Sequence, residues 1–285
     1  MPKFDPDSYS TVDSYTEAVE AFHAVTGMLL FEFARDEREL RDKIICNFIA
    51  RTNMMVRSIF RLWDLQDYQD CWIIFRSLLD RFFHLRHLQE RNEFEPFEAW
   101  SFLKQCNALD RVRNDPDIGA MQNSPLFSLT EDQKQRAKSL AQQPPVWTRP
   151  KAEDIAKQSN MRFLYRFGYD YASTHVHPMA DDGLQDFFSI TKLEPAPDFP
   201  DQRSVLSNTL LVGIMIVQDG LNASTYSWRA VVYNFLDDML HFLDTGSNQY
   251  QQQVLKLAAF IQAREHLCVR KSTDGTTDGS VSLPQ

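Results

Sequence analysis

The chain has 285 residues, of which 43% are hydrophobic and 24% are charged, and its formal net charge is −9. This composition excludes a wholly disordered or collagen-like chain, and nine glycines are too few for the many tight turns of a sandwich or barrel. An acidic chain gains no long-range attraction to phosphates, which disfavours a broad nucleic-acid or anionic-membrane surface but leaves room for a local basic groove.

Apolar residues recur at helical spacing along nearly the whole chain, which predicts an all-α, single-domain bundle of about eight helices. The first four helices are expected over about 13–35, 36–65, 70–90 and 97–113. The short break at 67–70 predicts an antiparallel hairpin between the second and the third.

The stretch 114–150 is rich in proline and polar residues, and we interpret it as an excursion from the bundle because no second core composition follows it. It is expected to hold one exposed helix, opened by Thr130 with capping-box spacing to Gln133 and ended before Pro144 and Pro145.

Further helices are expected over about 152–175, 205–226, 228–243 and 251–268, with a proline-rich loop over 192–201. The predicted organisation is an N-terminal segment at 1–12, a helical bundle at 13–270 and a disordered tail at 271–285.

Several features predict a cytoplasmic protein without a membrane span. The four cysteines lie far apart without a paired motif, and the N-terminus lacks the basic-then-apolar order of a signal peptide. The longest apolar stretch, Val205 to Val217, is shorter than the roughly 20 residues that cross a bilayer.

The expected helix at 70–90 is apolar almost all round, yet Arg76, Asp80, His84 and His87 fall within about 80° of one another on its helical wheel. Arg76 and Asp80 are four residues apart, so they can pair. If the helix is central, this charged stripe needs polar partners from another segment. The alternative is a solvated strip on an exposed edge.

A second polar stretch precedes Pro178, where Tyr169, Ser173 and His177 are spaced four residues apart. They share one face if the helix continues that far, and we expect Ser173 and His177 to face Arg76 and Asp80 across a helix contact. Histidines beside hydroxyl groups suit proton transfer. The alternative is a helix C-terminus that carries histidines for contacts with its carbonyl groups.

The segments RSLLDRFFHL (76–85) and YASTHVHP (171–178) resemble those of a family of uncharacterised, mostly bacterial helical proteins. That family has an Arg-Ser-x-x-Glu helix followed by a Tyr-x-x-Ser-x-x-x-His helix end. The resemblance covers about 47–179 and implies a helical fold with a site at Arg76, Asp80, Ser173 and His177, although Asp80 replaces the usual Glu and is one methylene shorter.

Two other site chemistries remain open. A distant likeness to the helical HEPN-type nucleases is suggested by Arg81 and His87, but these two do not share a helix face and Phe82 replaces the usual polar residue. His175, His177 and Asp181 could ligate a metal, although helical ligand pairs are missing around them. No phosphate loop, dinucleotide fingerprint, nucleophile elbow or zincin motif occurs. We therefore expect no cofactor and no metal.

Two functions of different classes follow. In the first, a hydrolase or nuclease acts on RNA or another phosphodiester: Arg76 holds the anion, His177 is general acid or base, Asp80 orients one of them, and Ser173 completes the candidate catalytic set. In the second, a non-enzymatic interaction protein uses the same residues as a structural polar lock and meets a protein partner elsewhere. Whether the protein is an enzyme stays open, and a homodimer is one hypothesis for its assembly.

Overall fold

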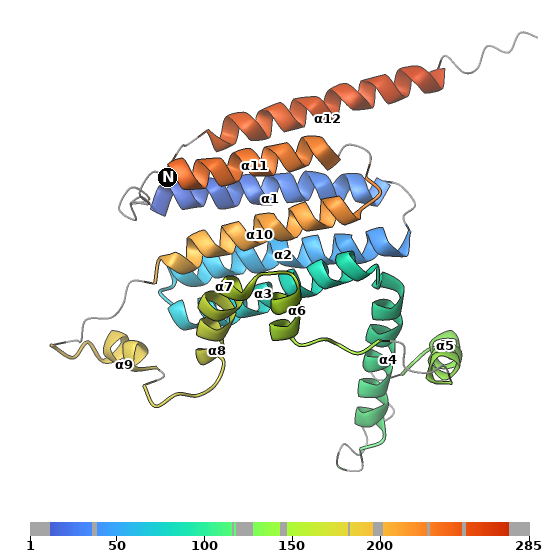
Figure 1. Cartoon of the computed structure of the whole chain (residues 1–285). Coiled ribbons are helices and arrows are strands. Elements are labelled where there is room, and N and C mark those ends of the chain that lie inside the picture. The colour runs from blue at the N-terminus through green and yellow to red at the C-terminus, as the bar shows by residue number, and fades with distance from the viewer. Residues whose placement is uncertain are drawn as a thin grey trace, which may run out of the picture.

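The computed structural model describes residues 12–35, 39–115, 117, 128–142, 147–181, 183–195, 202–226, 229–246 and 249–273. Across these ranges every regular element is helical and no strand occurs, so the all-α prediction is confirmed (Figure 1). The fold is a stack of long helices with shorter helices and one projecting helix attached to one side (Figure 1).

Three helices form the centre of the stack. They are α2 (Leu40–Asp64), α3 (Tyr68–Arg91) and α10 (Ser204–Ala223), which pack most extensively against one another. Helix α1 (Val12–Arg35) lies against α2 and α10. Helices α11 (Arg229–Thr245) and α12 (Tyr250–Thr273) complete the far side of the stack (Figure 1).

The predicted hairpin between the second and third helices is present. Helix α2 ends at Asp64, Gln66 adopts a left-handed φ of 64°, and the Asp67 side chain accepts the backbone N–H of Asp70 to cap α3. Ten residues of α3 are buried, as its all-round apolar pattern predicts.

Helix α10 approaches α2 closely because glycines face it at two positions. A Cβ atom at Gly213 would lie 3.0 Å from Val56 Cγ2, and one at Gly220 would lie 3.0 Å from Ile45 Cγ2. By length and composition alone α10 could span a membrane, but 72% of its most apolar window is buried inside the protein. This burial makes α10 a core helix of the stack.

The chain leaves the stack after α3. Helix α4 (Phe94–Arg113) projects away from it, and α5 (Glu131–Ala141) packs against α4 (Figure 1). The predicted capping box at the start of α5 is present in both directions, between the Thr130 hydroxyl and Gln133 N–H and between the Gln133 amide and Thr130 N–H. Pro144 and Pro145 lie outside the described residues.

The single helix predicted over 152–175 is interrupted. It is divided into α6 (Ala152–Gln158), α7 (Arg162–Leu164), a π-helix (Tyr165–Asp170) and α8 (Tyr171–Thr174). Asn160, with a left-handed φ of 56°, lies in the break between α6 and α7. Helix α9 (Leu184–Thr191) was not expected at all. These differences explain why the described chain has more helical segments than the eight expected.

Other boundaries differ in detail. Helix α12 continues to Thr273, so the first three residues of the predicted tail are helical. The remainder of the tail and residues 1–11 lie outside the described residues. The phenylalanines differ in burial: Phe82 and Phe83 are fully buried, whereas Phe31 and Phe187 are 65% and 49% exposed.

A partly buried ion pair joins two of the central helices. Asp219 of α10 accepts two hydrogen bonds from Arg86 of α3, from Nε and Nη2, each at 2.8 Å. Burial raises the pKa of Asp219 to about 6 even though Arg86 opposes that shift. The folded protein therefore binds a proton at Asp219 more readily than the unfolded chain does.

This raised pKa predicts how stability depends on pH. The contribution of Asp219 is fully present below its ordinary pKa and is lost as pH rises through about 6. Between pH 7.5 and 5, the free energy of unfolding should therefore rise more steeply on acidification in the wild type than in Asp219→Asn, as measured by urea denaturation. Equal pH slopes in the two proteins would contradict the assignment.

Candidate functional site

The polar stripe on α3 begins with an ion pair within the helix. Arg76 Nη1 donates to Asp80 Oδ2 at 3.0 Å, and the two side chains are 30% and 15% exposed. The stripe is therefore half-buried. This lies between the two alternatives from the sequence, a fully enclosed stripe and a strip exposed to solvent. Partners from another segment cover it, as the enclosed alternative requires.

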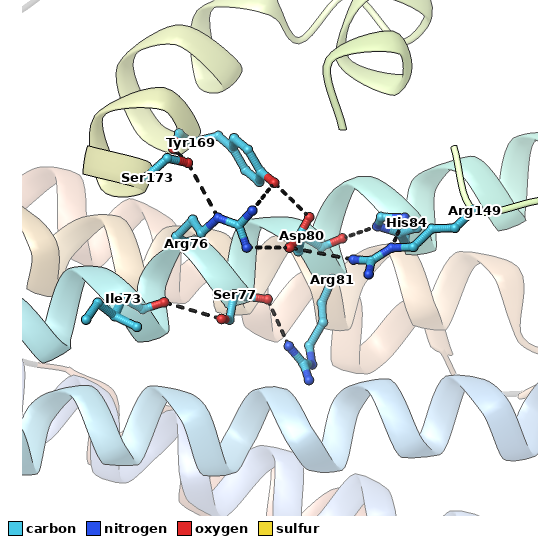
Figure 2. Close-up of polar contacts among 9 residues, drawn as sticks. All are labelled: Ile73, Arg76, Ser77, Asp80, Arg81, His84, Arg149, Tyr169 and Ser173. Carbon is cyan, nitrogen blue, oxygen red and sulfur yellow. Dashed lines mark hydrogen bonds and ion pairs between the residues drawn. The ribbon is translucent and has the colours of Figure 1, made fainter. Parts of the chain in front are cut away.

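Those partners are Tyr169 from the π-helix and Ser173 from α8. Arg76 Nη2 donates to the Tyr169 hydroxyl at 2.6 Å, and this hydroxyl donates to Asp80 Oδ1 at 3.3 Å. Arg76 Nε donates to Ser173 Oγ at 3.4 Å, and Ser173 Oγ donates to the Tyr169 carbonyl at 2.7 Å. Figure 2 shows the four side chains facing one another across the contact between α3 and the overlying segment.

In the Arg76 cluster, defined as Arg76, Asp80, Tyr169 and Ser173, each residue is hydrogen-bonded to at least one other member. Burial and then the charge of Asp80 raise the pKa of Tyr169, so its hydroxyl stays protonated and can donate. The Arg76 guanidinium also lies over the Tyr169 ring, 4.7 Å from its centroid. Arrangements of this kind fix the position of one helical segment on another.

Three of the four sequence-predicted site residues thus lie together, and His177 does not join them. His177 lies beyond the end of α8 with an exposed side chain, and among the described residues no hydrogen bond or ion pair connects it to Arg76 or Asp80. The expected face required a continuous helix to residue 177. The π-helix changes the register and α8 ends at Thr174, so Tyr169 occupies the place assigned to His177.

His84 continues the stripe one turn beyond Asp80. Its Nδ1 lies 2.7 Å from the Asp80 carbonyl, which can only accept, so Nδ1 carries the proton. Its Nε2 then carries a lone pair, which accepts a hydrogen bond from Arg149 Nε at 3.1 Å. Burial, with Arg149 also contributing, lowers the pKa of His84. His84 is therefore a neutral base with a defined tautomer at neutral pH.

A cavity of about 530 Å³ opens on the next face of α3. It is bounded by α2, α3, α4 and the stretch before α6, and three arginines line it: Arg51 from α2, Arg81 from α3 and Arg149. We call it the arginine cavity. Its other lining residues are Ile44, Asn47, Phe48, Ser77, Asp80, His84, Phe97, Glu98, Trp100, Ser101, Phe102 and Gln105.

Among the described residues, neither Arg51 nor Arg81 forms an ion pair with a carboxylate in this cavity, although the charge of Asp80 opposes part of the pKa shift of Arg81. Burial and then the Arg51 guanidinium lower the pKa of Arg81, which donates only to the Ser77 carbonyl of its own helix at 2.9 Å. No described carboxylate lies within ion-pair distance of either residue. Figure 2 shows Arg81 directed away from Tyr169 and Ser173.

The two carboxylates that line the cavity are already engaged. Asp80 accepts from Arg76 and lies 3.6 Å from Arg149 Nη2, and Glu98 pairs with Arg136 of α5. Like charges at close range are unfavourable unless an anion or solvent separates them. The arrangement can therefore hold an anion between α2 and α3.

Neither alternative site from the sequence forms a compact centre. His87 interacts with Glu93 at 3.2 Å and is absent from the lining of the arginine cavity, so it does not share a site with Arg81. His175 stacks on Trp72 at a centroid distance of 5.9 Å. Within the described ranges, no group of three or more His, Cys, Asp or Glu residues is placed to hold a metal ion.

Arg51 and Arg149, which come from segments on either side of α3, are not among the site residues that the sequence predicts. In the sequence, Arg81 and His84 belong to other patterns, the nuclease-like spacing and the charged stripe. The signal present in the sequence was the spacing of Ser77, Asp80, Arg81 and His84, which places four polar residues on one helix face.

The Arg76 cluster predicts a stability effect. Arg76→Ala leaves Asp80 with Tyr169 and Arg149, so the cost should be about 1.5–3 kcal/mol, less than the ~3–5 kcal/mol of a stranded buried charge. In a double-mutant cycle, Arg76→Leu with Asp80→Leu should cost less than the sum of the single changes. Urea denaturation measures both, with Arg57→Ala on α2 as a control expected within about 0.5 kcal/mol of wild type. Additive effects would show that no network exists.

Comparison with known proteins identifies one family. Residues 42–192, more than half of the chain, match a family of unknown function (DUF5677), and this match includes α3, Arg51, Arg149 and α8. The comparisons with curated proteins and with solved structures found no match. The predicted resemblance to an uncharacterised helical family is confirmed, and the chain belongs to the family of unknown function DUF5677.

Proposed function

We propose that the protein binds a phosphate-type anion in the arginine cavity. The observation that carries this proposal is that Arg51 and Arg81 face one cavity with no described carboxylate as partner. Burial of Arg81 beside a second guanidinium is unfavourable in the free protein. An anion between them would remove that cost and gain charge-assisted hydrogen bonds.

The chemistry of arginine favours phosphate as the anion. Each guanidinium presents a planar fork of donors that matches two oxygens of a phosphoryl group. Arg81 is half-buried, so its interaction with an anion is stronger than it would be on an open surface. Because the chain carries a net charge of −9, attraction of the anion depends on this local group rather than on the whole surface.

RNA-directed phosphodiester chemistry is the narrower form of the proposal. His84 supports it because its Nε2 lone pair is directed at Arg149, on the margin of the same cavity. If Arg149 turned to the phosphate, Nε2 could accept a proton from a hydroxyl group of the substrate. His84 is thus a better-placed base than His177, and Arg51 and Arg81 are better-placed anion ligands than Arg76, which the Arg76 cluster holds.

The alternative, a non-enzymatic interaction protein, is supported by two observations. The Arg76 cluster is closed on itself, as a structural lock would be. The segment that it holds carries exposed apolar side chains: Phe163 and Phe167 are 75% and 67% exposed, and their rings lie 4.6 Å apart. Exposed apolar patches of this kind mark protein contacts.

Calorimetric titration with pyrophosphate tests the anion site. The wild type should bind, and Arg51→Ala or Arg81→Gln should each weaken binding by about tenfold or more, because a charged hydrogen bond contributes about 1.5–3 kcal/mol. Arg57→Ala, on the same helix as Arg51 but outside the cavity, should bind within about twofold of wild type. Failure of the folded wild type to bind would overturn the anion site and leave the interaction protein as the account.

The lowered pKa of His84 predicts how anion affinity depends on pH. As pH falls below 6.5, the ordinary pKa of histidine, His84 takes up a proton and adds a positive charge beside Arg149 and Asp80. Affinity for sulfate, whose own charge is constant over this range, should therefore rise on acidification. In His84→Gln the rise should be smaller. The same pH profile in both proteins would rule out His84 as part of the anion site.

A further inference from the structure

The arginine cavity is lined by aromatic rings as well as by cations. Phe48 of α2 and three aromatic residues of α4, Phe97, Trp100 and Phe102, contribute to its surface. The rings of Phe97 and Trp100 are stacked, with centroids 6.2 Å apart and planes 25° apart. Both side chains are only half-buried, so part of each ring remains accessible from the cavity.

A buried tryptophan supports these rings from within the protein. Trp147 packs edge-on against Phe97 at 5.3 Å and against Trp100 at 4.9 Å. Its indole N–H donates to Glu93 at 2.8 Å, which fixes its orientation. The rings of Phe97 and Trp100, which we call the aromatic wall, are therefore held in place before any ligand binds. A preformed surface of this kind lowers the entropic cost of binding.

Amide side chains add a third kind of group to the cavity. Asn47 of α2 and Gln105 of α4 line it with exposed side chains, and Ser101 lies between Trp100 and Gln105 on the same helix. An amide offers a donor and an acceptor together, which is the pattern that matches the polar edge of a nucleobase. A site for a simple anion needs neither these amides nor the aromatic wall.

We propose that the arginine cavity binds a nucleotide, with its phosphate between Arg51 and Arg81 and its base stacked on Phe97 and Trp100. This inference rests on the proposed anion site and names the ligand class. The cavity volume of about 530 Å³ is within the roughly 300–1,000 Å³ of small-molecule sites and far exceeds the need of one phosphate group. Aromatic stacking is tolerant of base identity, so purine and pyrimidine nucleotides share the chemistry.

The first test compares ligands on the wild-type protein by calorimetry. AMP should bind about tenfold tighter than ribose 5-phosphate, which has the same phosphate but no base, because stacking on aromatic rings contributes about 5- to 150-fold. Adenosine, which has the base but no phosphate, should bind more weakly than AMP. Equal affinities for AMP and ribose 5-phosphate would overturn the nucleotide proposal while leaving the anion site intact.

The second test uses variants. Trp100→Leu should weaken AMP binding by about tenfold and leave pyrophosphate binding within about twofold, whereas Arg81→Gln should weaken both. Trp63→Leu, a change outside the cavity on α2, is the matched control and should alter neither affinity. A parallel loss of AMP and pyrophosphate binding in folded Trp100→Leu would contradict base stacking. If the wild-type protein itself does not bind pyrophosphate, the proposed anion site is contradicted.

A third measurement distinguishes a free nucleotide from the end of an RNA strand. A single-stranded pentamer of adenylate and AMP present the same base and phosphate chemistry. Tighter binding of the pentamer would assign the site to RNA, and tighter binding of AMP would assign it to a free nucleotide. Failure of both to bind would overturn the proposal.

Discussion

The carboxylate of Asp80 connects two polar systems that lie on adjacent faces of α3. Its Oδ1 accepts from the Tyr169 hydroxyl, and its Oδ2 accepts from Arg76 and lies 3.6 Å from Arg149. The negative charge of Asp80 also favours the protonated form of Arg81. One half-buried carboxylate therefore stabilises guanidinium groups from α3 and from the stretch before α6, and it also lines the arginine cavity.

The two faces of α3 have different chemical roles. On one face, each residue of the Arg76 cluster forms a hydrogen bond with another member of the cluster, which suits a contact that holds the π-helix and α8 in place. On the other face, Arg51 and Arg81 have no carboxylate partner among the described residues. The Arg76 cluster holds the overlying segment in place, whereas Arg51 and Arg81 on the other face form the proposed anion site.

Much of this fold follows from local sequence patterns. The all-round apolar pattern of α3 predicts its central place, and Thr130 with Gln133 predicts the cap of α5, because caps and periodicity depend on neighbours in the chain. The pairing of Arg76 with Asp80 is equally local. The partner Ser173 followed from the need to satisfy a charged stripe, which is a general physical requirement.

The remaining features depend on tertiary structure. The π-helix at 165–170 and the left-handed Asn160 interrupt a segment whose apolar periodicity predicts one continuous helix, and this break places Tyr169 rather than His177 on Arg76. The arginine cavity brings together residues 51, 81 and 149, and no local pattern relates positions so far apart. Its existence follows from the way α4 leaves the stack beside α2.

The division of α3 into a structural face and a binding face can be tested by NMR of the arginine side chains. The Nε–Hε signals of Arg51, Arg76 and Arg81 would be assigned with single Arg→Lys variants and followed during a titration with pyrophosphate. The account predicts that the Arg51 and Arg81 signals shift together and saturate at the same concentration, while the Arg76 signal stays in place. A shift of Arg76 without a shift of Arg51 and Arg81 would contradict it.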